Sequence, residues 1–380
     1  SPPAPEPSPP SADQSGVTPI RAGWFLPRMG DFSLDIQQLL LVAALTVLLL
    51  FLVGFPADVF NKTYEDRREE IHQALRAVGV KRRYRLPAWL QAVLLTVIAV
   101  GAAFLSSRGE GPAENLPAGN WKLHLAALLV AVPLVTAAYS VPGELYLRRI
   151  RGKASLYVPP LGLAAGVLCA VFSQLCGLNP AYAYGLFLMF VLASKKPGPT
   201  EPQKARGVLW SVAGLSVLIA LGWLGFSVNW HTAHAGHAGL LTVLIDAVAY
   251  WIVVIGAESL VFTLIPMRFL DGFTLAGWRL LSWLPLQVAS GLFFWYVIQC
   301  RAEVDGVAPA EDQWLRALGF FLIFGLAATA FWGYFQWPGR PTARFSDTPP
   351  APVYTMSRLT RPLCRLRKEA MAVRAAALPE

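Results

Sequence analysis

Long apolar runs alternate with charged or Pro- and Gly-rich segments along most of the chain. A helix that crosses the hydrocarbon core of a bilayer needs about 20 predominantly apolar residues. The pattern therefore predicts an all-α fold, a polytopic transmembrane bundle of about nine spans over residues 34–337, in which the fifth span is short. The predicted spans are residues 35–55, 87–106, 121–141, 156–177, 180–194, 207–228, 239–265, 274–299 and 314–336.

The two ends of the chain differ from its apolar middle. Seven prolines stand within the first 19 residues, and such a segment cannot bury enough apolar surface to fold. Residues 1–33 are therefore expected to be a disordered Pro-rich stalk that carries a further N-terminal domain, or a tail without cargo. Residues 338–380 are expected to form a basic cytoplasmic tail. Its apolar spacing predicts a helix over residues 361–377 on the membrane surface, with a soluble arm as the alternative.

A surface helix is also predicted directly after the first span. Thr63 followed by Asp66 resembles a helix N-cap with an acidic residue in the first turn. Ile71, Leu75 and Val78 then fall on one stripe of a helix near 64–78. This cytoplasmic amphipathic helix either docks a partner or anionic lipid, or packs on the bundle.

Composition and charge agree with a membrane protein. Hydrophobic residues make up 55% of the chain, charged residues make up 14%, and the mean hydropathy is +0.48, whereas an ordinary soluble domain carries about 25% charged residues. Of the 32 Lys and Arg residues, 25 fall in alternate loops that begin with residues 56–86. Cytoplasmic loops are enriched in Lys and Arg, so the N-terminus is expected outside and the C-terminus in the cytoplasm. The net charge of +9 is then a topology signal, and nucleic acid is not an expected partner.

Clusters of basic residues in the predicted cytoplasmic segments are expected to contact a protein partner or the anionic inner leaflet of the bilayer. These residues are Arg67, Arg68, Lys81, Arg82, Arg83, Arg365, Arg367 and Lys368.

Two carboxyl groups lie inside the seventh predicted span, Asp246 and Glu258. Charged groups within spans are costly and therefore mark candidate sites for proton or ion movement. Their sequence separation corresponds to about 18 Å along a helix, so direct contact is not expected. The alternative interpretation is that each carboxyl is neutral or pairs with a polar neighbour such as Arg268 or Arg279.

Other chemistry has weak support in the sequence. His231, His234 and His237 have a spacing that zinc or copper could use, although a solvated polar loop explains the same pattern. The chain contains no HExxH, GxSxG, P-loop or GxGxxG motif at a strand-to-helix turn. A non-enzymatic protein without cofactors is therefore expected.

The stretch from Glu258 to Gly272 resembles the signature of a group of actinobacterial membrane proteins named for an FGLLP motif, usually followed by LRFLDG. The segments Phe55–Glu65 and Asn179–Leu186 are similar to other parts of that group. The resemblance covers roughly residues 35–335 and implies a multi-pass protein of the bacterial cell membrane, with an extracytoplasmic N-terminal region and no assigned chemistry. The signature residues that match are Phe262, Leu264, Pro266, Arg268, Phe269, Leu270, Asp271 and Gly272, whereas Thr263 and Ile265 depart from it.

Two functions are compatible with these patterns. The first is a non-enzymatic membrane anchor and assembly platform, which presents an N-terminal region and binds a partner at its cytoplasmic face. Membrane partners of contractile injection particles are similar to it in organisation, which is a looser analogy. The second is a proton- or ion-coupled transporter that uses Asp246 and Glu258.

Overall fold

The computed structural model describes residues 26–31, 35–71, 120–151, 155–157, 189–191, 199–233, 239–268, 270–299 and 313–336, together with residues 93, 97, 101 and 175. Its elements are η1 (Met29–Asp31), α1 (Ile36–Asp66), α4 (Asn120–Arg151), β1 (Ser155–Tyr157), β2 (Met189–Val191), α6 (Glu201–Ala233), α7 (Leu240–Thr263), α8 (Asp271–Trp278), α9 (Leu280–Phe293), η2 (Phe294–Gln299) and α10 (Gln313–Gln336).

Six helical segments are long and apolar enough to cross a membrane, which supports the prediction of a helical membrane protein. They are α1, α4, α6, α7, the continuous segment of α9 and η2, and α10, and they correspond to six of the predicted spans. The predicted spans 87–106, 156–177 and 180–194 fall almost entirely outside the described residues. The same holds for the predicted tail helix 361–377.

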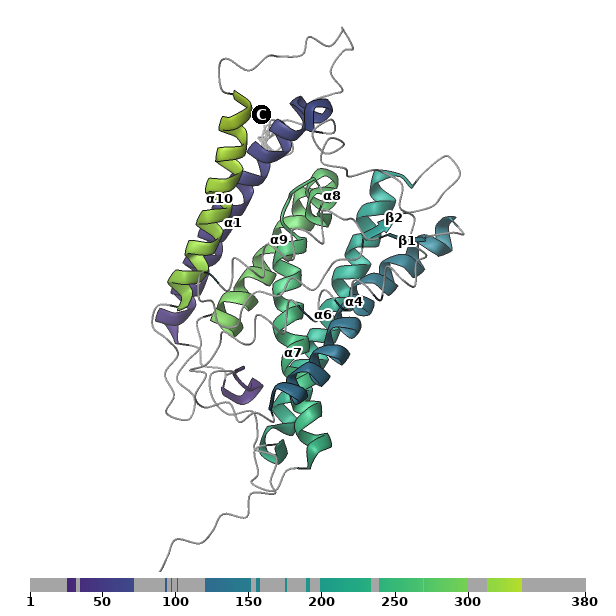
Figure 1. Cartoon of the computed structure of the whole chain (residues 1–380), viewed down its shortest axis with the longest axis vertical. Coiled ribbons are helices and arrows are strands. Elements are labelled where there is room, and N and C mark those ends of the chain that lie inside the picture. Colours follow the sequence, from purple (N-terminus) through teal and green to yellow (C-terminus); the bar gives the residue numbers. More distant parts are fainter. Residues whose placement is uncertain are drawn as a thin grey trace, which may run out of the picture.

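Three helices form the most closely packed part of the bundle. α4, α6 and α7 contact one another, α8 packs against α6 and α9, and α9 also contacts α7 (Figure 1). In the most apolar 18-residue stretch of α7, 67% of the residues are buried. Its small and branched side chains pack between neighbouring helices. Gly256 allows the side chain of Ile219 to approach closely, and Gly222 does the same for Ile252.

α1 and α10 run side by side along one side of the bundle (Figure 1). The ring centroids of Phe60 and Phe331 lie 5.1 Å apart. α1 also contacts α9 and η2, where Gly291 leaves room for the methyl group of Thr46. The pair is therefore attached to the other helices mainly through α9, η2 and the end of α1.

α1 is longer than the first predicted span, because it continues through Pro56 to Asp66. Gly325 of α10 lies against the Pro56 ring, which gives the proline space within the helix. The prediction that Thr63 begins a new helix is wrong: its hydroxyl donates a hydrogen bond of 2.8 Å to the Val59 carbonyl inside α1. A break in the helix follows instead at Arg67. The rest of the predicted helix beyond residue 71 lies outside the described residues.

α4 also extends beyond its predicted end, through Pro142 and Gly143 to Arg151. Close packing on α6 explains this continuation. A Cβ atom built on Gly143 would lie 2.9 Å from the Gly207 carbonyl oxygen. Glycine at position 143 therefore allows α4 to approach the backbone of α6, and this packing continues past Pro142.

The eighth predicted span is divided rather than continuous. α8 ends at Trp278, Arg279 adopts an extended backbone, and α9 begins at Leu280. The last residues of this segment form η2, a π-helix. Trp283 explains part of the division, since its indole N–H donates a 2.7 Å hydrogen bond to the Leu264 carbonyl and so fixes the start of α9 beside the end of α7.

β1 and β2 are the exception to helical structure among the described elements. They pair antiparallel, with Ser155 opposite Val191 and Tyr157 opposite Met189. Leu156 and Tyr157 of β1 lie in the predicted fourth span, and Met189–Val191 of β2 lies in the predicted fifth span, so the helical prediction is wrong at these residues. Aromatic and β-branched side chains favour strands, and pairing satisfies backbone groups on the facing edge of each strand.

Candidate functional site

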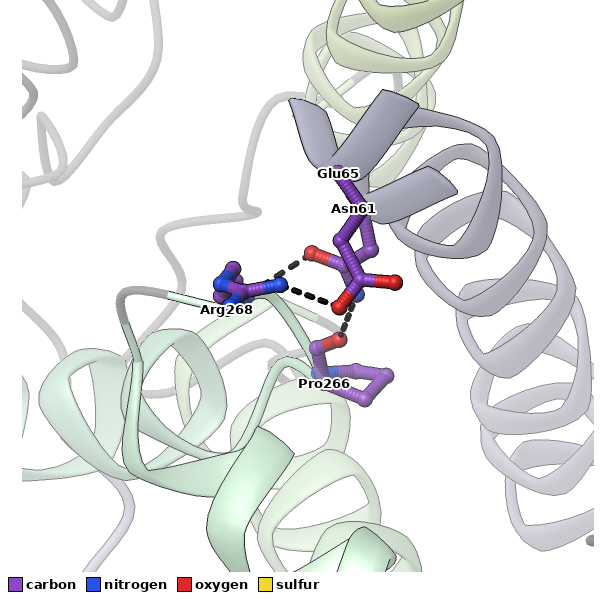
Figure 2. Close-up of polar contacts among 4 residues, drawn as sticks. All are labelled: Asn61, Glu65, Pro266 and Arg268. Carbon is purple, nitrogen blue, oxygen red and sulfur yellow. Dashed lines mark hydrogen bonds and ion pairs between the residues drawn. The ribbon is translucent and has the colours of Figure 1, made fainter. Parts of the chain in front are cut away.

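The most extensively bonded polar site in the described residues joins the end of α1 to the turn between α7 and α8. We call it the junction and define it by Asn61, Glu65, Pro266 and Arg268 (Figure 2). The Asn61 side-chain N–H donates a 2.7 Å hydrogen bond to the Pro266 carbonyl. The Asn61 side-chain oxygen accepts a 2.8 Å hydrogen bond from the Arg268 backbone N–H. One amide side chain thus satisfies both a donor and an acceptor of the turn.

An ion pair reinforces these hydrogen bonds. The Arg268 guanidinium donates to the Glu65 carboxylate, and the two side chains are 35% and 30% exposed. The same guanidinium lies 5.8 Å from the ring centroid of Tyr64. Ion pairs with solvent access contribute about 0.2–1 kcal/mol each, whereas the two hydrogen bonds of Asn61 contribute about 1 kcal/mol each. Asn61 is therefore the larger contributor to the stability of the junction.

The turn itself is tightly folded. The Met267 N–H donates to the Ile265 carbonyl at 2.8 Å, and the Leu270 N–H donates to the Met267 carbonyl at 2.8 Å. A Cβ atom on Gly272 would lie 2.5 Å from the Ile265 carbonyl oxygen and closer still to that of Leu264. Glycine is therefore required at the first turn of α8, because backbone atoms occupy the space of a side chain.

Asp271 connects this turn to α4. The Tyr139 hydroxyl donates a hydrogen bond to the Asp271 carboxylate. Burial raises the pKa of the Asp271 carboxyl above its ordinary value, and the hydrogen bond from Tyr139 opposes that shift. The α7–α8 turn is thus bonded to α1, α4 and α9 by side chains from three different helices.

Two apolar residues of the FGLLP-like segment, Phe262 and Leu264, pack in the core next to the turn. Phe262 packs on Phe320 and Phe321 of α10, with ring centroids 6.1 Å and 5.9 Å away. Leu264 is fully buried. The signature residues therefore form a structural node in which polar members bind α1 and α4 and apolar members enter the core.

The structure brings together two segments that the sequence analysis treated separately. The segment Phe55–Glu65 contributes Asn61 and Glu65, and the segment Glu258–Gly272 contributes Pro266 and Arg268. The roles of Asn61 and Glu65 were not predicted from the sequence. Nothing in the local sequence signals a contact between residues more than 200 positions apart.

The intramembrane carboxyl groups are buried, as expected for residues inside a span. Asp246 is 5% exposed and Glu258 is fully buried, both on α7. The side chain of Asn229 from α6 interacts with Asp246, while one Asp246 carboxyl oxygen has no hydrogen-bond partner among the described residues. Arg268, which the sequence analysis considered as a partner for these groups, pairs with Glu65. Arg279 stacks on Trp278, with its guanidinium carbon 4.9 Å from the ring centroid.

Of the basic residues proposed as a partner or lipid surface, the structure describes Arg67 and Arg68. Arg67 is partly buried: it pairs with Glu70 at 2.8 Å and lies 3.5 Å from the Phe335 carbonyl at the end of α10. Arg68 is exposed. The positions of Lys81, Arg82, Arg83, Arg365, Arg367 and Lys368 lie outside the described residues.

Metal binding by the three histidines gains no support from the described part of the chain. His231 is exposed in the last turn of α6, and His234 and His237 lie outside the described residues. The described residues contain no group of three or more His, Cys, Asp or Glu side chains that could hold a metal ion.

Comparison with known proteins adds no relative: no protein family, curated protein or solved structure matches the chain.

Proposed function

We propose that the chain is a non-enzymatic multi-pass membrane anchor and assembly platform, which presents its N-terminal region on one side of the membrane and binds a protein partner on the other. The observation that carries this proposal is the extension of α1. Its 31 residues correspond to about 46 Å of helix, compared with about 30 Å of hydrocarbon. Part of α1 therefore extends beyond the hydrocarbon core, and the polar sequence of its last turns, Asn61–Asp66, favours that end.

The junction gives this projecting part a fixed position. Asn61 and Glu65 bind it to the α7–α8 turn, and Arg67 lies against the end of α10. Exposed charges on the same turns are then presented from a rigid support. These exposed residues are Lys62, Asp66, Arg68 and Glu69.

Charge at the helix ends supports the proposed orientation. The bundle end that contains the junction carries most of the basic residues in the described helices, and the positive-inside rule favours the cytoplasm for that end. Its basic residues are Lys62, Arg67, Arg68, Arg148, Arg149, Arg151, Lys204, Arg206, Arg268 and Arg279, whereas Arg28, Lys122 and Arg316 lie toward the opposite end. The resemblance to the FGLLP-motif group, which implies a bacterial cell membrane, fits the same proposal.

A transporter is the second candidate, and Asp246 favours it. A buried carboxyl with one unbonded oxygen among the described residues is expensive in a membrane. Proton or ion movement would explain why such a group is kept on α7. Glu258 lies on the same helix, twelve residues further along, and would be a second site for the transported proton or ion.

Two variants in a strain that lacks the gene distinguish these functions. Deletion of residues 1–25 removes most of the predicted stalk, and the Asp246→Asn substitution removes the charge while keeping the side-chain shape. The anchor proposal predicts that the deletion fails to complement the strain and that Asp246→Asn complements it. Complementation by the deletion together with failure of Asp246→Asn would overturn the anchor proposal in favour of transport. Membrane levels of both variants provide the control for expression.

A further inference from the structure

The segment that precedes α1 packs against the end of α6, far from the junction. We call Leu26–Asp31 the N-terminal strap, and it includes η1, which contacts α6 (Figure 1). These residues belong to the segment 1–33 that is predicted from the sequence to be a disordered Pro-rich stalk. Leu26 is only 3% exposed, so the strap is part of the packed structure.

Three consecutive residues of the strap contact one face of α6. The Trp223 indole N–H donates a 2.7 Å hydrogen bond to the Pro27 carbonyl. The Arg28 guanidinium lies 5.6 Å from the Trp230 ring centroid. The Met29 backbone N–H donates a 3.0 Å hydrogen bond to the hydroxyl of Ser227. Because Trp223, Ser227 and Trp230 are spaced i, i+4 and i+7, they share this face.

The chemistry of this face suits an extended, proline-containing peptide. Aromatic side chains that border a groove recognise such peptides by packing on apolar atoms and donating to carbonyl oxygens. The Pro27 carbonyl accepts the hydrogen bond from the Trp223 indole, and Arg28 adds a cation–π contact with Trp230. Trp223 is also held by Phe293 of α9, with ring centroids 5.5 Å apart, so the donor is presented from a rigid position.

We propose that this face of α6 is an intramolecular docking site for the N-terminal strap, and that it fixes the point at which the N-terminal region leaves the membrane domain. The inference rests on the proposed role in presenting the N-terminal region. Four residues separate the strap from α1, so its contacts with α6 lie near the start of α1, while the junction holds the other end of α1.

Hydrogen exchange on the full chain in detergent micelles tests the docking site. Trp223→Phe removes the indole N–H and keeps a ring against Phe293, and Ser227→Ala removes the acceptor for the Met29 N–H. Loss of one hydrogen bond of ordinary net strength corresponds to about fivefold faster exchange in the strap. Trp210→Phe is the matched control, because Trp210 is on the same helix and 56% exposed, and it should leave exchange unchanged.

The two substitutions act on different contacts, which keeps the test decisive. Faster exchange in residues 26–31 for both variants, with unchanged exchange in α7, supports the docking site. Exchange in the strap that stays at the wild-type rate in both variants overturns it, as does an equal increase in Trp210→Phe. Exchange is measured without reference to complementation, so failure of the docking site and failure of the anchor proposal are separate results.

Discussion

Replacing Gly272 by alanine tests whether the α7–α8 turn is as tightly closed as its backbone indicates. The added Cβ would lie 2.5 Å from the Ile265 carbonyl oxygen and closer still to the carbonyl group of Leu264. These are backbone atoms, so no side chain can rotate away. Overpacking a closed site costs about 1–3 kcal/mol, and the upper end is expected because the indole of Trp283 also holds Leu264 in place.

Gly277 provides the matched control within the same eight-residue helix. No described atom lies within 4 Å of a Cβ built at Gly277, and replacing a helical glycine by alanine stabilises by about 0.5–1 kcal/mol. Thermal unfolding in detergent, followed by circular dichroism, should therefore give shifts of opposite sign for Gly272→Ala and Gly277→Ala. Equal midpoints for Gly272→Ala and the wild type would refute the proposed geometry of the turn.

Three further predictions concern contacts between helices. Gly143→Ala should destabilise the protein by about 1–3 kcal/mol, because its Cβ would meet the Gly207 carbonyl oxygen at 2.9 Å; chemical or thermal unfolding should show no such loss for Gly225→Ala, where no described atom lies within 4 Å. Asn61→Leu should cost about 2 kcal/mol through two lost hydrogen bonds, and a loss of the same size in the exposed Lys62→Leu would contradict that origin. Burial raises the pKa of Asp271, so its contribution to stability is present when it is protonated and is lost as the pH rises through the folded-state pKa. The thermal midpoint of Asp271→Asn should therefore exceed that of the wild type most at high pH, and a difference that grows on acidification would be the opposite of this expectation.

Hydropathy was sufficient to locate the described membrane helices but not their ends. α7 and α10 lie within a few residues of their predicted bounds, because an apolar run of spanning length has few alternatives in a bilayer. α1 and α4 continue beyond their predicted ends through Pro56 and Pro142. Because proline disfavours a helix interior, Pro56 and Pro142 were expected to mark helix ends. In the structure both lie inside helices, where Gly325 of α10 leaves room for Pro56 and α4 packs closely on α6.

The junction shows the limit of local reasoning most clearly. The segment around Arg268 was singled out by a resemblance, and its partner Glu65 lay in a second such segment, yet the pairing of the two residues was not predicted. The expected partners of the intramembrane carboxyl groups were the arginines nearest in sequence. Ion pairs depend on which helix ends meet, and that depends on how the helices pack.

By itself, the sequence determined that this chain is an apolar, helical protein with helices able to cross a membrane, because composition and run length constrain a chain in a bilayer directly. Only the tertiary structure decided that Asn61 and Glu65 hold the α7–α8 turn, and that Leu26–Asp31 lies on α6 rather than in a free stalk. Contacts of this kind join residues about 200 positions apart. They arise from the close approach of particular helix faces, which no local pattern of apolar and polar residues specifies.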